Sequence, residues 1–450
     1  MPFIPHSEAD TNHMLAALQV SKIDDLYDEI PNNINRTALG NAPSAGLDEI
    51  AMSRLMLQRQ PNPQLLCFIG AGAYQHHVPA AISDLIGRGE FYSAYTPYQA
   101  EASQGSLQVM HEYQGMISRL MAMDVANASL YDGASATAEA ALMACRLQRG
   151  KKNRLVVPST LHPAYRAVLN TILKQQNISI DTVAYNQHGQ IDLASYTKKC
   201  AGSAAVILPQ PNFFGVIDDV NTLTNLAAEQ QARVIAVVNP LTCAQLLPPG
   251  QWGDNGADIA CGEGQPLGIP LASGGPYFGF MCTRKSFVRQ LPGRIVGRTE
   301  DVNGNIGYTL TLQAREQHIR RGKATSNICT NQGLMVVAAS IYMQLHGGTG
   351  MQKITDRCHH NTNTLLQQLT RYPGVERVFD APFWHEAVIR FKQHTTAEVL
   401  NQLRSARIQG GYDLKTTHPE LGECLLICAT ETINEHDIRH YVTTLQDLLG

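Results

Sequence analysis

One short segment concentrates side chains that can donate, accept or hold a proton. The string YTPYQAEASQ carries phenols, a hydroxyl, an amide and a carboxylate, at Tyr95, Thr96, Tyr98, Gln99 and Glu101. Gln104 follows them, and Pro97 restricts the backbone between the two tyrosines. Polar groups so close together are costly to bury without hydrogen-bond partners. Either they pack and hydrogen-bond inside this chain, or they lie at an interface.

A glycine-containing string, FIGAGAYQHH, could be compared with a dinucleotide-binding loop. That loop needs three glycines, but only Gly70 and Gly72 are present, and Gln75 stands at the third position. Glycine also serves wherever the backbone must turn tightly. We therefore expect a turn here and no nicotinamide site.

The segment YDGASATAEAALMA predicts a strand end, a turn and then an alanine-rich helix. Gly133, Ser135 and Thr137 stand where the helix should begin. Unpaired N–H groups at a helix start suit phosphate, and pyridoxal-phosphate enzymes of the aminotransferase type have such a loop here. Helix capping by Ser135 or Thr137 would select the same residues. The sequence leaves both interpretations open.

Enzymes of that type also need an acid beside the pyridine nitrogen and a lysine for the Schiff base. The strand RVIAVVNP should supply the acid, but it ends at Asn239, and an amide does not keep the ring nitrogen protonated as a carboxylate does. The next strand leads to the glycine-rich turn at Gly274 and carries no lysine. An enzyme that works alone would have to use Lys323 or Lys285, which leaves the missing acid unexplained.

Metal ligands and disulfides are not expected. The ten cysteines stand mostly in apolar surroundings, which is typical of small buried side chains in a reducing compartment. Cys424 and Cys428 share one face of a predicted strand but would lie about 13 Å apart. His76–His77 and Cys358–His360 are histidine-rich, but neither has a second cluster to complete a four-ligand site.

The elements that must position these residues form an α/β pattern. Apolar runs without alternation predict strands buried on both faces of a mainly parallel sheet, with helices between them. The runs are Leu65–Gly70, SLYDG, RLVVPS, Ala204–Gln210, Arg233–Pro240, ADIACG and PYFGFMCT. We predict a helical N-terminal arm over 1–62, a large α/β domain over 63–310 and a smaller C-terminal α+β domain over 311–450.

Composition is consistent with a soluble cytoplasmic protein. Hydrophobic residues make up 44% and charged residues 16% of the 450 residues, so a large core can be buried. A formal net charge of -3 argues against nucleic acid as the main partner. We find no apolar run long enough for a membrane span and no secretory signal at the start, MPFIPHSEAD.

Several long strings resemble one family, the glycine-decarboxylating P-proteins of the glycine cleavage system. They are GAGAYQHHVPAAI, FYSAYTPYQAEASQGSLQ, PQPNFFGVIDD, GQPLGIPLASGGPYFGF and REQHIRRGKATSNICTNQ. The resemblance runs from about residue 1 to 445 and corresponds to the first half of single-chain P-proteins. Gly322 departs from the pattern, because relatives often carry Glu there.

The resemblance implies the fold of a pyridoxal-phosphate-dependent, aminotransferase-like (fold type I) enzyme without its cofactor. A second subunit would carry lysine-bound pyridoxal phosphate in a segment similar to HKTFSIPHGGGGPG. Aligned with it, GQPLGIPLASGGPY places Gln265 where that lysine would be. Gln265, Asn239, Gly133 and Ser135 would then be vestigial cofactor positions.

The resemblance also implies a reaction carried out by a complex, as a pair of heterodimers. Glycine would be decarboxylated, and its aminomethyl group would pass to the lipoyl arm of H-protein. This chain would contribute Tyr95, Thr96, Tyr98, Gln99 and Glu101 across the subunit interface and would be inactive alone. Arg320, Arg321 and Lys323 could serve an interface, an H-protein surface or a solvated helix end. The alternatives are the self-sufficient enzyme above and a non-catalytic scaffold.

Overall fold

The computed structural model describes residues 5–31, 33–34, 46–60 and 65–449, and the chain divides into two compact units, Met1–Pro63 and Gln64–Gly450. The described part of the first unit contains helices α1 (Glu8–Ala17) and α2 (Glu49–Arg59). The side chains of Ser7 and Asp48 cap these two helices. Residues 1–4, 32, 35–45 and 61–62 of the predicted arm lie outside the described residues. The proposed boundaries, including the one between 310 and 311, stay a prediction.

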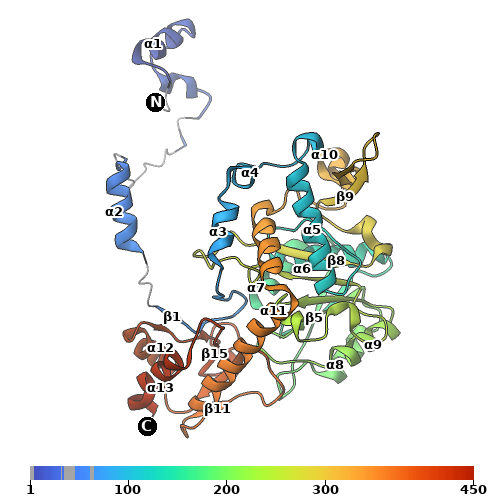
Figure 1. Cartoon of the computed structure of the whole chain (residues 1–450), viewed down its shortest axis with the longest axis vertical. Coiled ribbons are helices and arrows are strands. Elements are labelled where there is room, and N and C mark those ends of the chain that lie inside the picture. Colours follow the sequence, from blue (N-terminus) through green and yellow to red (C-terminus); the bar gives the residue numbers. More distant parts are fainter. Residues whose placement is uncertain (1–4, 32, 35–45, 61–64, 450) are drawn as a thin grey trace. The chain divides into compact units, whose positions relative to one another are not determined.

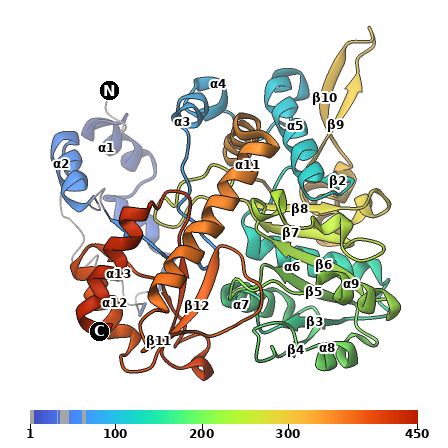
Figure 2. The same ribbon diagram turned by 60° about the horizontal axis from the view of Figure 1, so that its bottom comes forward.

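The centre of the second unit is a seven-stranded sheet of order β2-β8-β7-β6-β5-β3-β4 (Figures 1 and 2). The four pairings from β4 to β7 are parallel, whereas β8 is antiparallel to both β7 and β2. The strands are β2 (Val125–Ala126), β3 (Arg154–Pro158), β4 (Ser179–Val183), β5 (Ala205–Gln210), β6 (Arg233–Val238), β7 (Ile259–Glu263) and β8 (Gly279–Thr283). The mainly parallel sheet is therefore confirmed.

Helices cover both faces of this sheet, so the strands are buried on both sides. Neighbouring residues of one strand enter different cores: Val206 belongs to the cluster that includes α5, and Ile207 to the cluster that includes α6. This arrangement explains why apolar and polar residues do not alternate in the sequence of these strands. The helices are α5 (Gln104–Leu120), α6 (Gly133–Leu147), α7 (Pro163–Leu173), α8 (Leu193–Cys200) and α9 (Val220–Glu229).

Two strand assignments were wrong. The run Leu65–Gly70 forms only β1 (Leu66–Cys67), which pairs with β13 (Ile408–Gln409) outside the central sheet. SLYDG forms no strand and makes a single bridge between Leu130 and Gly279. An apolar run indicates burial but does not name the partner strand, so these errors could not be avoided from periodicity.

The C-terminal part has a four-stranded antiparallel sheet of order β11-β12-β15-β14, as expected of an α+β unit. Its strands are β11 (Val375–Arg377), β12 (Glu386–Phe391), β14 (Tyr412–Asp413) and β15 (Cys424–Cys428). Helices α12 (Thr396–Ser405) and α13 (Glu435–Leu449) pack here. The long helix α11 (Gly333–Leu369) bends at Gly347, contacts α5 at one end, and reaches α13 and β12 at the other (Figure 2).

The remaining described elements are short or lie at the rim of the second unit. They include α3 (Ala80–Ile86), α4 (Gly89–Tyr92), α10 (Gln317–Arg320) and the antiparallel hairpin of β9 (Ile295–Glu300) and β10 (Ile306–Thr311). Among the described helices, none combines the length and the apolar character needed to cross a membrane.

Candidate functional site

A cavity opens where the parallel strands of the central sheet end. Asn212 follows β5, Asn239 follows β6, and Glu263 is the last residue of β7. The other walls come from His162 before α7, from the loop at Gly72–Tyr74 and from His385–Glu386 at the start of β12. In open α/β sheets, ligands usually bind at the carboxyl ends of the parallel strands. A cofactor would therefore be expected in this cavity.

Gln265, which the family resemblance led us to expect at the position of a Schiff-base lysine, lies in the turn after β7. Its side chain is fully buried, and its Oε1 accepts from the Tyr74 N–H at 2.9 Å. Its Nε2 donates to the carbonyls of Tyr74 at 2.8 Å and Ile269 at 2.7 Å. All of these partners are backbone groups, so the amide fastens the Tyr74 loop to the turn after β7.

Asn239, which we expected at the position of the ring-pairing acid, lies beside a histidine. Asn239 Oδ1 accepts from the Leu241 N–H at 3.1 Å, and its Nδ2 lies 3.4 Å from Nε2 of His385. Burial lowers the pKa of His385 to about 3, so this ring is neutral. A neutral amide beside a neutral imidazole does not supply the charge that a protonated pyridine nitrogen needs.

Carboxylates already occupy the helix start that was considered for phosphate. Asp132 Oδ1 caps α6 by accepting from the Ser135 N–H at 2.7 Å. Glu263 Oε2 accepts from the Gly133 N–H at 3.0 Å, and its Oε1 faces the N–H groups of Gln265 and Phe278. Of the two open interpretations, the capped helix fits this geometry, although the cap is Asp132 and not Ser135 or Thr137.

The residues present do not fit pyridoxal phosphate. A Cβ atom at Gly133 would lie 2.1 Å from the Tyr165 hydroxyl and 2.6 Å from the Glu263 nitrogen, so there is no free space at the α6 start. The described residues that line the cavity include no lysine. Lys285 and Lys323 are both exposed and lie outside this lining.

Two buried carboxyl groups give the cavity its electrostatic character. Burial raises the pKa of Glu263 to about 7, although the hydrogen bonds from Gly133, Gln265 and Phe278 oppose this shift. Burial likewise raises the pKa of Glu386 to about 7, against hydrogen bonds from the Ala71 N–H and the Tyr74 hydroxyl. Burial lowers the pKa of His162. Glu386 and His162 hold the loop of Gly70–Tyr74 in place through hydrogen bonds to Ala71 and Tyr74, whereas Glu263 binds the start of α6 and the turn after β7.

The predicted YTPYQ residues lie elsewhere, on an exposed loop between α4 and α5. Tyr95 is 90% exposed and Tyr98 is 53% exposed, and Gln99 and Glu101 are also exposed. Thr96 is half-buried. Tyr95 therefore does not pack inside this chain, whereas the Tyr98 hydroxyl does find a hydrogen-bond partner within it. Gln104 instead joins this loop to β10, because its amide bonds the backbone of Tyr308 in both directions.

Tyr98 is held by a buried arginine that the sequence analysis did not consider. Arg294 is 3% exposed, and its guanidinium donates to the Tyr98 hydroxyl at 3.1 Å. Its other bonds reach the string after α10, at the Cys329 carbonyl, Thr330 Oγ1 and Asn331 Oδ1. Two of the strings that carried the family resemblance thus meet at one guanidinium.

The basic residues of RRGKATSN lie at the surface. Arg320, Arg321 and Lys323 are all exposed, and none of them lines the cavity at the sheet edge. Arg315 is different, because its Nη2 donates to the Gly293 carbonyl at 2.7 Å and so supports the segment that carries Arg294.

Comparison with known proteins places these features in one family. The profile of the glycine cleavage system P-protein family matches residues 1–445. The chain belongs to this P-protein family. It is 55% identical to a probable glycine dehydrogenase (decarboxylating) subunit 1 of Coxiella burnetii (strain Dugway 5J108-111), with 100% of both chains covered. A protein of the same name from Nitrosospira multiformis is also 55% identical, over 100% of this chain and 99% of the relative.

Solved structures support both the family and the fold. A crystal structure of glycine decarboxylase (P-protein) in inhibitor-bound form is 36% identical, with 100% of both chains covered and a TM-score of 0.88. A Burkholderia pseudomallei sphingosine-1-phosphate lyase covers 91% of this chain and 92% of its own at 13% identity and a TM-score of 0.65, which shows the fold alone. The P-protein chain thus has fold type I of the pyridoxal-phosphate enzymes.

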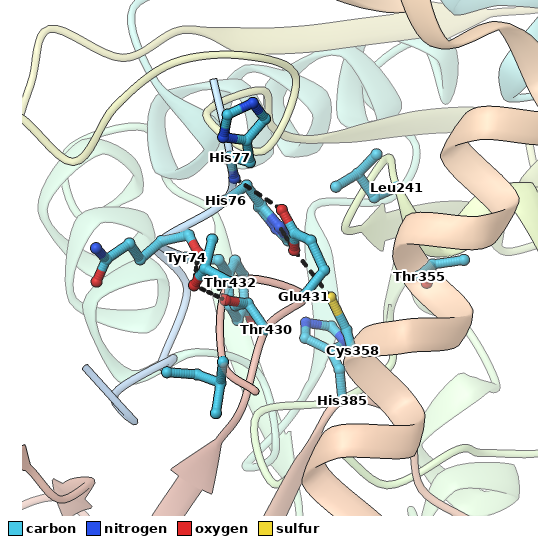
Figure 3. A network of polar contacts seen from close by, with 12 residues as sticks. Tyr74, His76, His77, Leu241, Thr355, Cys358, His385, Thr430, Glu431 and Thr432 are labelled. Atoms are coloured by element: carbon cyan, nitrogen blue, oxygen red, sulfur yellow. Dashed lines mark hydrogen bonds and ion pairs between the residues drawn. The ribbon is translucent and has the colours of Figure 1, made fainter. Parts of the chain in front are cut away.

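Sequence reasoning missed several residues that the fold brings into this P-protein site. Glu263 stands two positions before Gln265 at a strand end, so its place could have been noticed. Arg294 and Glu386 carry no comparable local signal. The fold also brings the two histidine-rich segments together, because His76 and Cys358 lie in one cluster with Glu431 (Figure 3).

Proposed function

We propose that this chain is the cofactor-free subunit of a two-subunit glycine decarboxylase. A partner subunit of similar size carries the Schiff-base lysine and pyridoxal phosphate, which supplies the electron sink for loss of carbon dioxide from glycine. The aminomethyl group that remains passes to the lipoyl arm of H-protein. This chain completes the active site from across the interface and is inactive by itself.

One observation carries the proposal: Gln265 and Glu263 are tied to the protein backbone beside the cavity at the sheet edge, while the YTPYQ loop stays exposed. Gln265 and Glu263 fill the lysine and phosphate positions with hydrogen bonds to backbone. Tyr95 and Tyr98 present phenols that are 90% and 53% exposed, and exposed aromatic side chains that lie close together are typical of surfaces that a partner covers. Relatives that carry the words subunit 1 in their name are in line with such a partner.

The contribution across the interface comes from Tyr95, Thr96, Tyr98, Gln99 and Glu101. Tyr98 is the best-positioned of these, because Arg294 fixes its hydroxyl from the buried side. Among the described residues, no carboxylate pairs with Arg294, so its positive charge is available to polarise the phenol. The guanidinium also fixes the position of the Tyr98 hydroxyl, so that it can meet a partner group in a defined geometry.

An absorption experiment tests the proposal. The purified chain is mixed with pyridoxal phosphate, desalted and scanned, and the scan is repeated with the co-purified partner subunit. We expect no retained Schiff-base band from this chain alone, and a band that responds to glycine in the mixture. A borohydride-fixable band on this chain alone would instead favour a self-sufficient enzyme that uses Lys323 or Lys285. A chain that assembles with no lysine-bearing partner would favour the scaffold.

A further inference from the structure

A second cluster of reactive side chains lies apart from the residues proposed to act at the interface. His76 comes from the loop between β1 and α3, Cys358 from α11, and Glu431 from the loop between β15 and α13. Figure 3 shows the three side chains pointing toward one another. Their ligand atoms (a ring nitrogen, a thiol sulfur and a carboxylate oxygen) all lie within 4.8 Å of one another.

The carboxylate is the centre of this cluster. Glu431 Oε2 lies 2.7 Å from Nδ1 of His76 and 3.3 Å from Sγ of Cys358. Its second oxygen accepts from the His77 N–H at 2.7 Å, which orients the carboxylate toward the other two side chains. Metal-binding carboxylates are held by hydrogen bonds of this kind.

The surrounding backbone holds the two loops in register. The Thr430 hydroxyl donates to the Gln75 carbonyl at 2.6 Å, and the Thr432 hydroxyl donates to the same carbonyl at 3.3 Å. The ligand-bearing segments are therefore fixed to each other before any ion binds, which favours a preorganised site.

The cluster is buried and its carboxylate has no fixed positive charge beside it. The side chain of His76 is 3% exposed and that of Glu431 is 13% exposed, and among the described residues no Lys or Arg forms an ion pair with Glu431. A divalent ion bound to a thiolate, a carboxylate and a neutral imidazole gives a neutral set, which lowers the cost of burying these groups. The buried Tyr342 hydroxyl and the Nε2 of His76 find no partners among the described residues.

We propose that His76, Cys358 and Glu431 form a zinc site, with the fourth position open to water or another ligand. Nitrogen, sulfur and oxygen donors together suit Zn²⁺ better than Mg²⁺ or Ca²⁺, which prefer oxygen alone. Tetrahedral zinc would place the nitrogen and oxygen about 3.4 Å apart and the sulfur and oxygen about 3.6 Å apart. The His76 nitrogen and the Glu431 oxygen, now 2.7 Å apart, would therefore separate by about 0.7 Å, and the Cys358 sulfur and that oxygen, now 3.3 Å apart, by about 0.3 Å.

Such a site would clamp the loop that carries Tyr74 to α11 and to the C-terminal sheet. The Tyr74 backbone is also the partner of the Gln265 amide. The zinc would therefore stabilise the same loop that lines the cavity at the sheet edge.

The test uses the purified full-length chain, stripped with a chelator and then titrated with Zn²⁺ or with Co²⁺ as a spectroscopic probe. We expect one ion per chain, a thiolate-to-cobalt charge-transfer band and a higher melting temperature. Cys358→Ser should remove the band and weaken binding at least about 10-fold. Cys424→Ser is the matched control, since its thiol is buried in β15 and a hydroxyl can keep its bond to the Leu421 carbonyl.

The wild-type titration alone can refute the site. Less than stoichiometric Zn²⁺, or cobalt bound without a thiolate band, would show that the three side chains form a hydrogen-bonded cluster and nothing more. Binding that is equal in wild type and Cys358→Ser would assign the metal to other residues and overturn the proposal. Glu431→Gln gives a second check with the thiol intact, and it too should weaken binding at least about 10-fold.

Discussion

The buried guanidinium of Arg294 donates a 3.1 Å hydrogen bond to the hydroxyl of Tyr98 and also lies over its ring, 5.3 Å from the centroid. The tyrosine is half exposed while the arginine is not, so the pair connects the surface of the YTPYQ loop with the interior. Arg294 also forms hydrogen bonds with residues 329–331, which belong to the segment REQHIRRGKATSNICTNQ that ends at Gln332. This relationship makes Tyr98 the first residue to test.

We expect Tyr98→Phe to lower glycine decarboxylation by the reconstituted complex at least about 10-fold, in line with loss of a hydrogen bond to a charged group. Folding should change little, because Arg294 keeps its other three acceptors. The measurement is turnover of the complex together with the affinity between the subunits. Unchanged turnover and affinity would rule out an active-site role. Tyr92→Phe is the control, since this phenol is 72% exposed and stands outside the motif.

A lysine at the vestigial position should not restore a cofactor site. We expect Gln265→Lys to show no Schiff-base band and no glycine decarboxylation without a partner, because Asn239 and Glu263 remain in place. The variant should also be less stable by about 3 kcal/mol, since the buried amide loses its backbone partners. Absorption spectra and urea unfolding measure both effects. Gln344→Lys on the exposed side of α11 is the control for an added charge.

Robust activity of Gln265→Lys alone would contradict this account of the closed cavity. It would mean that the Glu263 carboxylate leaves the α6 start when a phosphate competes for the same N–H groups. The spectrum distinguishes that outcome from simple unfolding, because an unfolded chain gives neither a stable band nor turnover.

Two glycines at helix starts should respond in opposite ways to alanine. At Gly133 an added Cβ would meet the Tyr165 hydroxyl and the Glu263 backbone, so we expect a loss of about 3 kcal/mol. At Gly105 in α5 nothing lies within 4 Å of the added atom, and alanine should stabilise the chain by about 1 kcal/mol. Urea unfolding of both variants tests whether the α6 start is filled. A Gly133→Ala variant as stable as wild type would show that it is not.

The sequence was informative where a local pattern determines structure. The buried strands β5 and β6 were predicted to within one residue at their starts, and Asn239 was correctly placed at the end of β6. The YTPYQ residues were named from their polar side chains, but their exposure could not be derived, because burial depends on which elements pack around a loop. Gln265 was named as a replacement for lysine, whereas its three backbone partners were not predictable.

Contacts between distant residues account for most of what the sequence did not reveal. Arg294 and Tyr98 are separated by 196 positions, and His76 and Glu431 by 355. Neither pair has a spacing that a helix or strand period would bring together. The parallel order of the sheet decides which strand ends share an edge, and only the fold supplies that order. Cys358 and His76 likewise come together only in the folded chain, although both lie in segments that were noted as histidine-rich.

The buried carboxyl of Glu386 should make stability depend on pH. Its pKa is raised by burial from 4.5 to about 7, so the folded chain holds this proton more tightly than the unfolded chain does. The resulting stabilisation of the folded chain amounts to about 3 kcal/mol. It is fully present below pH 4.5 and is lost as the pH rises to about 7. Its titratable neighbours Tyr74 and Cys428 have pKa values raised by burial and stay neutral in this range.

Glu386→Gln isolates this effect, because the amide can accept from the Ala71 N–H and donate to the Tyr74 hydroxyl without titrating. We expect the free energy of unfolding of the variant, relative to wild type, to increase between pH 5 and pH 8. Urea unfolding at several pH values measures that difference, and the contributions of Glu263 and Asp218, whose pKa values burial also raises to about 7, cancel in it. A difference that stays constant across this range would mean that Glu386 is already ionised at pH 5.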